Sequence, residues 1–147
     1  MSGHHFLFVP GPSNVPAAVQ QAIHCPMEDH RNPTIPDLIQ PITQDLKKIL
    51  RTEKGKVVFF PSSGTGCWEA ALQSTLNIGD KVLGASFGQF SMLWLDMCKR
   101  LQFEPITMEE EWGTGANPES YHKHLSEDKN HEIKCVLVCQ NETATGV

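Results

Sequence analysis

The strongest constraint on the fold is an alternation of strand-like runs and helix-like segments that begins after residue 56. Four short runs are predicted to be strands: Val57–Phe60, Lys81–Ala85, Glu104–Met108 and Cys135–Cys139. Apolar runs without polar alternation, such as the first and the last, are typical of strands buried on both faces. Alternation of such strands with helices predicts an α/β fold, with a mainly parallel sheet and helices on both faces.

Five segments are predicted to be helices: residues 15–24, 37–50, 66–76, 89–103 and 118–126. In the second of these, apolar residues recur at the three- and four-residue spacing of one helix face. Pro41 interrupts that pattern, so it falls either in the first helical turn or at a kink. Asn14 is placed to cap the first helix, and the residues before it are expected to form an extended arm.

Composition limits the function classes. The chain has 147 residues, the size of one domain, and a formal net charge of −5 with no basic stripe, which argues against a nucleic-acid partner. No segment approaches the roughly 20 apolar residues of a membrane span, and the N-terminus has no signal-peptide core. We therefore expect an intracellular protein that binds no membrane.

The cysteines do not form a recognisable framework. There are five, an odd number without a tight pattern, which favours free thiols in a reducing compartment: Cys25, Cys67, Cys98, Cys135 and Cys139. The last two bracket a predicted strand and are expected to be core residues. No cluster of cysteine, histidine and carboxylate residues has metal-ligand spacing, so no metal site is predicted.

The loop after the first predicted strand is the first candidate site. It reads Pro61-Ser62-Ser63-Gly64-Thr65-Gly66 and leads into a helix. Glycines let a ligand approach the backbone, the helix start presents unpaired N–H groups, and Ser63 and Thr65 add hydroxyls, an arrangement that suits a phosphate dianion. It has neither the lysine spacing of a P-loop nor a dinucleotide-binding G-x-G-x-x-G. The alternative is an ordinary strand-to-helix turn capped by a hydroxyl.

Two further segments follow strands at the same predicted edge of the sheet. Gly88-Gln89-Phe90-Ser91 opens the next helix, where the ring of Phe90 could either stack on a flat ligand or belong to the core. The segment from Gln140 to Val147 places hydroxyls and amides just beyond the last strand. By itself it is also consistent with a simple polar loop.

Together these segments resemble class V aminotransferases, which share the type I pyridoxal-phosphate (aspartate aminotransferase-like) fold. The similarity is greatest to serine–glyoxylate and alanine–glyoxylate aminotransferases, over their N-terminal portion. It rests on Phe8–Pro16, Asp29-His30-Arg31, Ser63-Gly64-Thr65-Gly66 with Trp68-Glu69-Ala70, Gly88-Gln89-Phe90-Ser91, Glu111-Trp112-Gly113 and Asn141-Glu142-Thr143-Ala144-Thr145-Gly146-Val147.

The resemblance implies a role for each matched residue. Ser63, Gly64 and Thr65 would bind the phosphate of pyridoxal 5'-phosphate, Phe90 would stack on its ring, and Thr143 would hydrogen-bond on the side of its phenolic oxygen. The arm from Pro10 to Asn14 would approach the substrate pocket and a dimer partner.

The resemblance also implies an activity. It is transamination from serine or alanine, small-molecule amino acids, to the 2-oxo acid glyoxylate, in glyoxylate or photorespiratory metabolism, by a homodimer. Plant-like relatives are peroxisomal, with an address that would lie beyond this chain.

Several family features are expected to lie outside the chain. The Schiff-base lysine, the aspartate that pairs with the ring nitrogen, and the arginine that grips the substrate carboxylate have no match here, so no catalytic residue is assigned. We expect residues 1–25 to form the arm and a short helix, and residues 26–147 an incomplete N-terminal part of the large domain. The family topology would also leave Val57–Phe60 without neighbouring strands. The chain is then a fragment, a truncated gene model or a short isoform, inactive alone.

Three alternatives remain open. A cysteine desulfurase shares the fold type, although no cysteine here lies in a mobile loop rich in glycine and serine. The chain could instead be a non-catalytic truncated partner that joins the dimer of a longer subunit. It could also be an unfolded relic.

Overall fold

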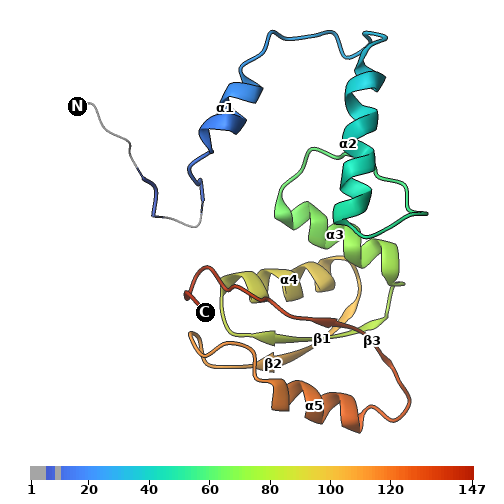
Figure 1. The fold of residues 1–147 in the computed structure, drawn as a ribbon. Helices are drawn as coiled ribbons and strands as arrows, with labels where there is room; N and C mark the ends of the chain where they lie inside the picture. Colours follow the sequence, from blue (N-terminus) through green and yellow to red (C-terminus); the bar gives the residue numbers. More distant parts are fainter. Residues whose placement is uncertain (1–5, 9–10) are drawn as a thin grey trace. The chain divides into compact units, whose positions relative to one another are not determined.

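A computed structural model describes residues 6–8 and 11–147 (Figure 1). Residues 1–5, Val9 and Pro10 of the predicted arm lie outside the described residues. Contacts divide the chain into two compact units, Met1–Pro61 and Ser62–Val147. Every buried residue of the described chain lies between Leu72 and Glu142, so the hydrophobic core belongs to the second unit.

The first unit begins with a short helix, α1 (Ala17–Ile23). The prediction that Asn14 caps this helix is wrong. Pro16 occupies the N-cap position, and the side chain of Asn14 instead accepts a hydrogen bond from the amide of Leu7 at 2.7 Å. Asn14 therefore fastens the extended arm rather than the helix.

The second helix of this unit, α2 (Ile35–Ile49), settles the ambiguity at Pro41. Pro36 takes a place at the start of the helix, where its missing N–H is not needed. Pro41 lies inside the helix, so α2 continues through it. None of its residues is buried, although the apolar ones gather on one face.

The second unit is built on a parallel sheet, as predicted. Its strands are β1 (Lys81–Ser86), β2 (Glu104–Glu109) and β3 (Ile133–Leu137). The order is β2-β1-β3, and Leu83 at the centre faces Ile106 on one side and Val136 on the other. β3 lies two residues earlier than predicted, so Cys139 is beyond the strand.

The prediction of a strand over Val57–Phe60 is wrong. The segment has no regular secondary structure, and the side chain of Phe60 is 81% exposed. A strand needs a neighbour to satisfy its N–H and C=O groups, and the segment pairs with none of the three strands.

Helices cover both faces of the sheet, again as predicted. They are α3 (Gly64–Thr75), α4 (Gln89–Arg100) and α5 (Pro118–Glu127). Figure 1 shows α4 and α5 on opposite faces of the sheet. Val82 packs with Leu72 of α3 and Leu95 of α4, whereas the adjacent Leu83 packs with Tyr121 of α5. This alternation is the two-residue period of a strand covered on both sides.

Tyr121 ties α5 to the end of the sheet. Its buried hydroxyl accepts a hydrogen bond from the amide of Ala85 at 3.0 Å and donates one to the carbonyl of Leu137 at 2.8 Å. Burial raises the pKa of this phenol, which keeps the O–H donor in place. The hydroxyl thus joins β1 to β3 close to the edge where the candidate site residues follow the strands.

Candidate functional site

The start of α3 offers unpaired hydrogen-bond donors. The helix begins at Gly64, two residues earlier than predicted, with Ser63 as its N-cap. The Ser63 hydroxyl makes no capping bond, and within residues 6–8 and 11–147 the amides of Gly64 and Thr65 meet no acceptor. Unpaired first-turn amides at the positive end of a helix attract anions. The alternative of a hydroxyl-capped turn is therefore not what forms.

The two glycines of this loop differ in their surroundings. A Cβ on Gly66 would lie 2.0 Å from the Oγ of Ser62, whereas a Cβ on Gly64 would meet nothing within 4 Å. A side chain at Gly66 would therefore displace the hydroxyl of Ser62, and Gly64 leaves open space beside the free amides. A tetrahedral phosphate fits this combination of exposed backbone donors and open space.

Thr65 also borders a surface hollow of about 400 Å³ between α3 and α4. Glu69 of α3 and Asp96 and Arg100 of α4 line the same hollow, where the guanidinium of Arg100 is paired with the carboxylate of Asp96 at 2.7 Å. Phe90 and Thr143 are not among its lining residues. The hollow is therefore separate from the residues that the sequence assigned to the ring of the cofactor.

Phe90, in the first turn of α4, is held by an aromatic cluster. Its ring is edge-on to that of Trp68 on α3, with 6.4 Å between the ring centroids, and it remains 38% exposed. Trp68 in turn stacks on Trp94 of α4 at 4.8 Å and 12°. Trp68 is one turn beyond Thr65, so this cluster fixes Phe90 relative to the start of α3.

Thr143 is exposed in the loop after β3, next to a carboxylate that the sequence did not single out. Glu142 is 0% exposed, and its oxygens accept hydrogen bonds from the amides of Ser91 at 2.9 Å and Phe90 at 3.1 Å. Burial opposes the charged carboxylate, but hydrogen bonds from the amides of Ser91, Phe90 and Ala144 outweigh it, so the pKa of Glu142 is below its ordinary value.

Contacts within the described chain connect the predicted residues only through intermediate residues. Phe90 and Thr143 are linked through Glu142, and Phe90 is linked to the phosphate loop through Trp68. No hydrogen bond joins the side chains of Ser63 or Thr65 to Phe90 or Thr143. Glu142 gave no sequence signal of its own, because its partners are about 50 residues away in the chain.

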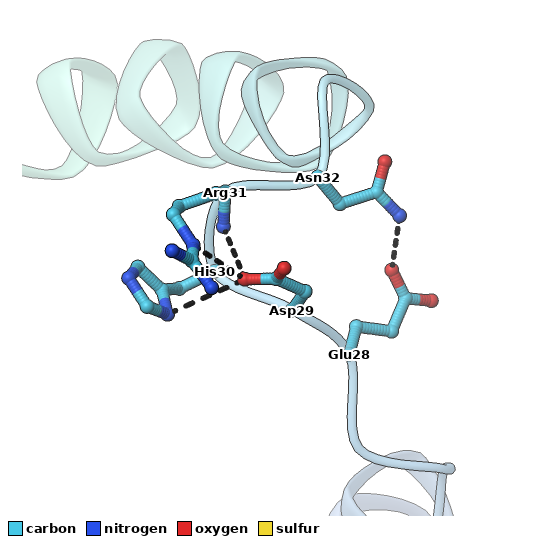
Figure 2. A network of polar contacts seen from close by, with 5 residues as sticks. All are labelled: Glu28, Asp29, His30, Arg31 and Asn32. Carbon is cyan, nitrogen blue, oxygen red and sulfur yellow. Dashed lines mark hydrogen bonds and ion pairs between the residues drawn. The ribbon is translucent and has the colours of Figure 1, made fainter.

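The first unit holds another matched motif, Asp29-His30-Arg31 (Figure 2). The Asp29 carboxylate accepts hydrogen bonds from the amide of Arg31 at 3.0 Å and from its Nε at 3.2 Å. The Nδ1 of His30 lies 3.6 Å from the same oxygen, and Asn32 donates to Glu28 at 3.3 Å. These contacts are local and exposed, so they shape the loop before α2 and do not create a buried site.

The described part of the chain gives no support for a metal site or a membrane-spanning helix. Within the described part of the chain, no group of three histidine, cysteine or acidic side chains is arranged to hold a metal ion, and no helix is long and apolar enough to cross a membrane. The cysteines are free thiols. Cys98 lies in the core, where burial raises its pKa to about 11, so its thiol stays protonated and unreactive at neutral pH.

No family model matches the chain, but individual proteins do. It is 55% identical over 141 residues to a serine–glyoxylate aminotransferase of Hyphomicrobium methylovorum, which covers 96% of this chain and 35% of that protein. It is 48% identical over 145 residues to the serine–glyoxylate aminotransferase of Arabidopsis thaliana, with 99% and 36% covered. The chain therefore spans about a third of the length of the curated relatives it matches.

Solved structures of glyoxylate aminotransferases have a similar fold. The fold is similar to that of an ureidoglycine–glyoxylate aminotransferase from Bacillus subtilis, with a TM-score of 0.76, 25% identity, and 94% of this chain and 35% of that chain covered. An alanine–glyoxylate aminotransferase from Nostoc gives 0.68 and 27%, with 86% and 34% covered. Over nearly its whole length the chain is therefore similar to the N-terminal portion of serine–glyoxylate aminotransferases, and its fold is similar to that of glyoxylate aminotransferases.

Proposed function

We propose that this chain supplies the phosphate- and ring-binding part of a pyridoxal-phosphate-dependent aminotransferase that transfers the amino group of serine or alanine to glyoxylate. The observation that carries the proposal is the start of α3, where the amides of Gly64 and Thr65 and the hydroxyl of Ser63 are available to a phosphate. The sequence relatives that carry the same activity in their names support the choice of reaction.

Each residue of the site has a distinct task in this proposal. Ser63, Gly64 and Thr65 hold the phosphate through hydroxyl and backbone donors. The exposed face of Phe90 supports the ring, and the hydroxyl of Thr143 donates to the phenolic oxygen. Pyridoxal phosphate, when bound, supplies the electron sink that an amino-group transfer requires.

The chemical steps need groups that the chain does not offer. None of its lysines follows the motif that marks the Schiff-base lysine of the family, so this chain of 147 residues is expected to bind the cofactor without turning over substrate. The reaction therefore depends on residues that longer relatives carry beyond the matched third of their length.

We also propose that the first unit contributes to a homodimer, as the family resemblance implies. The apolar face of α2 supports this proposal, since Ile49 is 74% exposed, Leu38 is 62% exposed and Ile42 is 42% exposed. Apolar side chains gathered on one exposed helix face are typical of a surface that another chain covers.

The phosphate assignment is tested by titrating the chain with inorganic phosphate and with pyridoxine 5'-phosphate, followed by tryptophan fluorescence and calorimetry. Replacing Ser63→Ala and Thr65→Val together removes two hydroxyl donors to a charged group and should weaken both ligands about tenfold or more. Ser126→Ala is the control, because that hydroxyl lies on α5 and bonds only to its own helix. Equal affinity in the double variant and the control would overturn the assignment.

A further inference from the structure

Glu142 is buried in a way that the binding of a cofactor does not by itself explain. The side chain is 0% exposed, yet no lysine, arginine or histidine is paired with it in the described chain. Its charge is stabilised by backbone amides instead: Oε2 accepts from Ser91 at 2.9 Å, and Oε1 accepts from Phe90 at 3.1 Å and Ala144 at 3.3 Å. Burying a carboxylate is costly unless such bonds compensate it.

The surrounding backbone is shaped to admit this side chain. A Cβ on Gly88 would lie 2.2 Å from the Cγ of Glu142 and 2.4 Å from its Cδ. The backbone of Gly88 is extended, with a φ of 176°, so only the lack of space requires a glycine there. The loop also folds around Glu142, whose carbonyl accepts hydrogen bonds from Thr145 at 3.2 Å and Gly146 at 2.9 Å.

The starts of α3 and α4 are therefore used differently. The first-turn amides of α4 are occupied by a carboxylate from the chain itself, whereas those of α3 are open. Both helix starts attract anions, and an internal carboxylate at one of them leaves the other for an external ligand.

The same bonds set the position of two side chains. Phe90 provides one of the amides that Glu142 accepts from, and Thr143 follows Glu142 directly in the chain. We propose that Glu142 is a positioning residue, whose carboxylate fastens the loop after β3 to the start of α4 and so holds Phe90 and Thr143 where both can contact one flat ring. This inference rests on the proposed function for the identity of the ring.

The first test is hydrogen exchange of the 147-residue chain by NMR, without any ligand. In Glu142→Gln one oxygen becomes an NH₂ group that cannot accept, and the other loses its charge. The amides of Phe90 and Ser91 donate to different oxygens, so the one that loses its acceptor should exchange about tenfold faster or more. The amides of β1 should keep their protection, which shows that the sheet is intact. Glu127→Gln, an exposed glutamate on α5, is the matched control.

The second test separates the ring from the phosphate. Pyridoxine 5'-phosphate should bind Glu142→Gln about tenfold more weakly than the parent, while the affinity for inorganic phosphate stays the same, because the α3 loop is untouched. Glu142→Asp keeps the charge and should recover part of the lost ring affinity and amide protection. A merely structural role would weaken both ligands together.

The outcomes distinguish this inference from the proposed function. If the parent chain binds neither ligand, the proposed function fails, while faster exchange at Phe90 or Ser91 in Glu142→Gln still supports the fastening role. If the parent binds both and Glu142→Gln binds pyridoxine 5'-phosphate equally well, the positioning role is overturned. If Glu142→Gln loses the protection of β1, Glu142→Asp takes its place in the comparison with the parent. Faster exchange at Phe90 and Ser91 in Glu142→Asp together with unchanged affinity for pyridoxine 5'-phosphate then overturns the positioning role.

Discussion

Two glycines at the starts of helices show how differently single positions are constrained. Gly64 begins α3 in open space, and Gly88 caps α4 against the buried side chain of Glu142. Neither has a φ in the left-handed region, so backbone freedom explains neither glycine. The two positions differ only in the space available for a side chain. Adding a methyl group at each position therefore tests that difference.

Gly88→Ala should destabilise the chain by about 1–3 kcal/mol, because the new methyl overlaps two buried carbon atoms that have little room to move. Gly64→Ala should change the free energy of unfolding by less than about 0.5 kcal/mol or raise it slightly, since alanine favours a helix. Urea unfolding followed by tryptophan fluorescence measures both. Equal stability of the two variants would show that Glu142 does not occupy the space beside Gly88.

At the residue scale, features made of consecutive residues could be proposed from the sequence, and contacts between distant residues could not. The candidate phosphate loop could be proposed from the sequence because its glycines, hydroxyls and helix start are consecutive in the chain. The role of Glu142 was not, because its amide partners Phe90 and Ser91 are about 50 residues away and contribute backbone groups that leave no mark in the sequence. The predicted topology placed Phe90 and Thr143 at the same edge of the sheet, and only the resemblance assigned both to one cofactor ring.

Among the helices and strands, the contact between α3 and α4 decides how the site residues are spaced. It is made by Trp68, whose ring stacks on Trp94 and meets Phe90 edge-on. Aromatic pairs of this geometry contribute roughly 0.5–1.5 kcal/mol beyond the area they bury. Trp68 is therefore expected to stabilise the unit and to hold the ring of Phe90 in place.

Trp68→Leu should lower the free energy of unfolding by at least about 1 kcal/mol and remove the near-ultraviolet circular dichroism that two stacked indoles produce. Trp112→Leu is the control, because Trp112 is half exposed and makes no ring contact in the described chain. Its dichroism spectrum should lose only the contribution of one isolated indole. Similar spectra from the two variants would mean that the tryptophan stack does not form in solution.

The secondary structure was predictable where the residues of a segment themselves favour a helix or a strand. β1 and β2 were each predicted to within one residue, and α5 likewise, with Pro118 in its first turn. Val57–Phe60 reads as a strand just as well, but a strand is completed by its neighbours, and this segment has none among β1, β2 and β3. The pattern of apolar residues is a property of one segment, whereas strand pairing depends on residues elsewhere in the chain.

At the scale of the whole molecule, the core is unevenly distributed. The two core clusters lie entirely in Ser62–Val147, around β1, and α1 and α2 in the first unit contain no buried residue. Local stability follows buried apolar contacts, so the two units should differ widely in how often they open. The sequence did not show this difference, because α2 has the apolar periodicity of a well-packed helix.

Native-state hydrogen exchange should therefore divide the chain near Pro61. Amides of β1, which lies between two strands, should exchange slowest, and those of α1 and α2 should exchange close to the rates of an unfolded chain. Measuring at two protein concentrations tenfold apart provides the control: protection of α2 that rises with concentration would identify a second copy covering its apolar face, as the proposed dimer requires. Strong protection of α2 at the lower concentration would contradict the expected division, because it would mean that this helix is packed within the single chain.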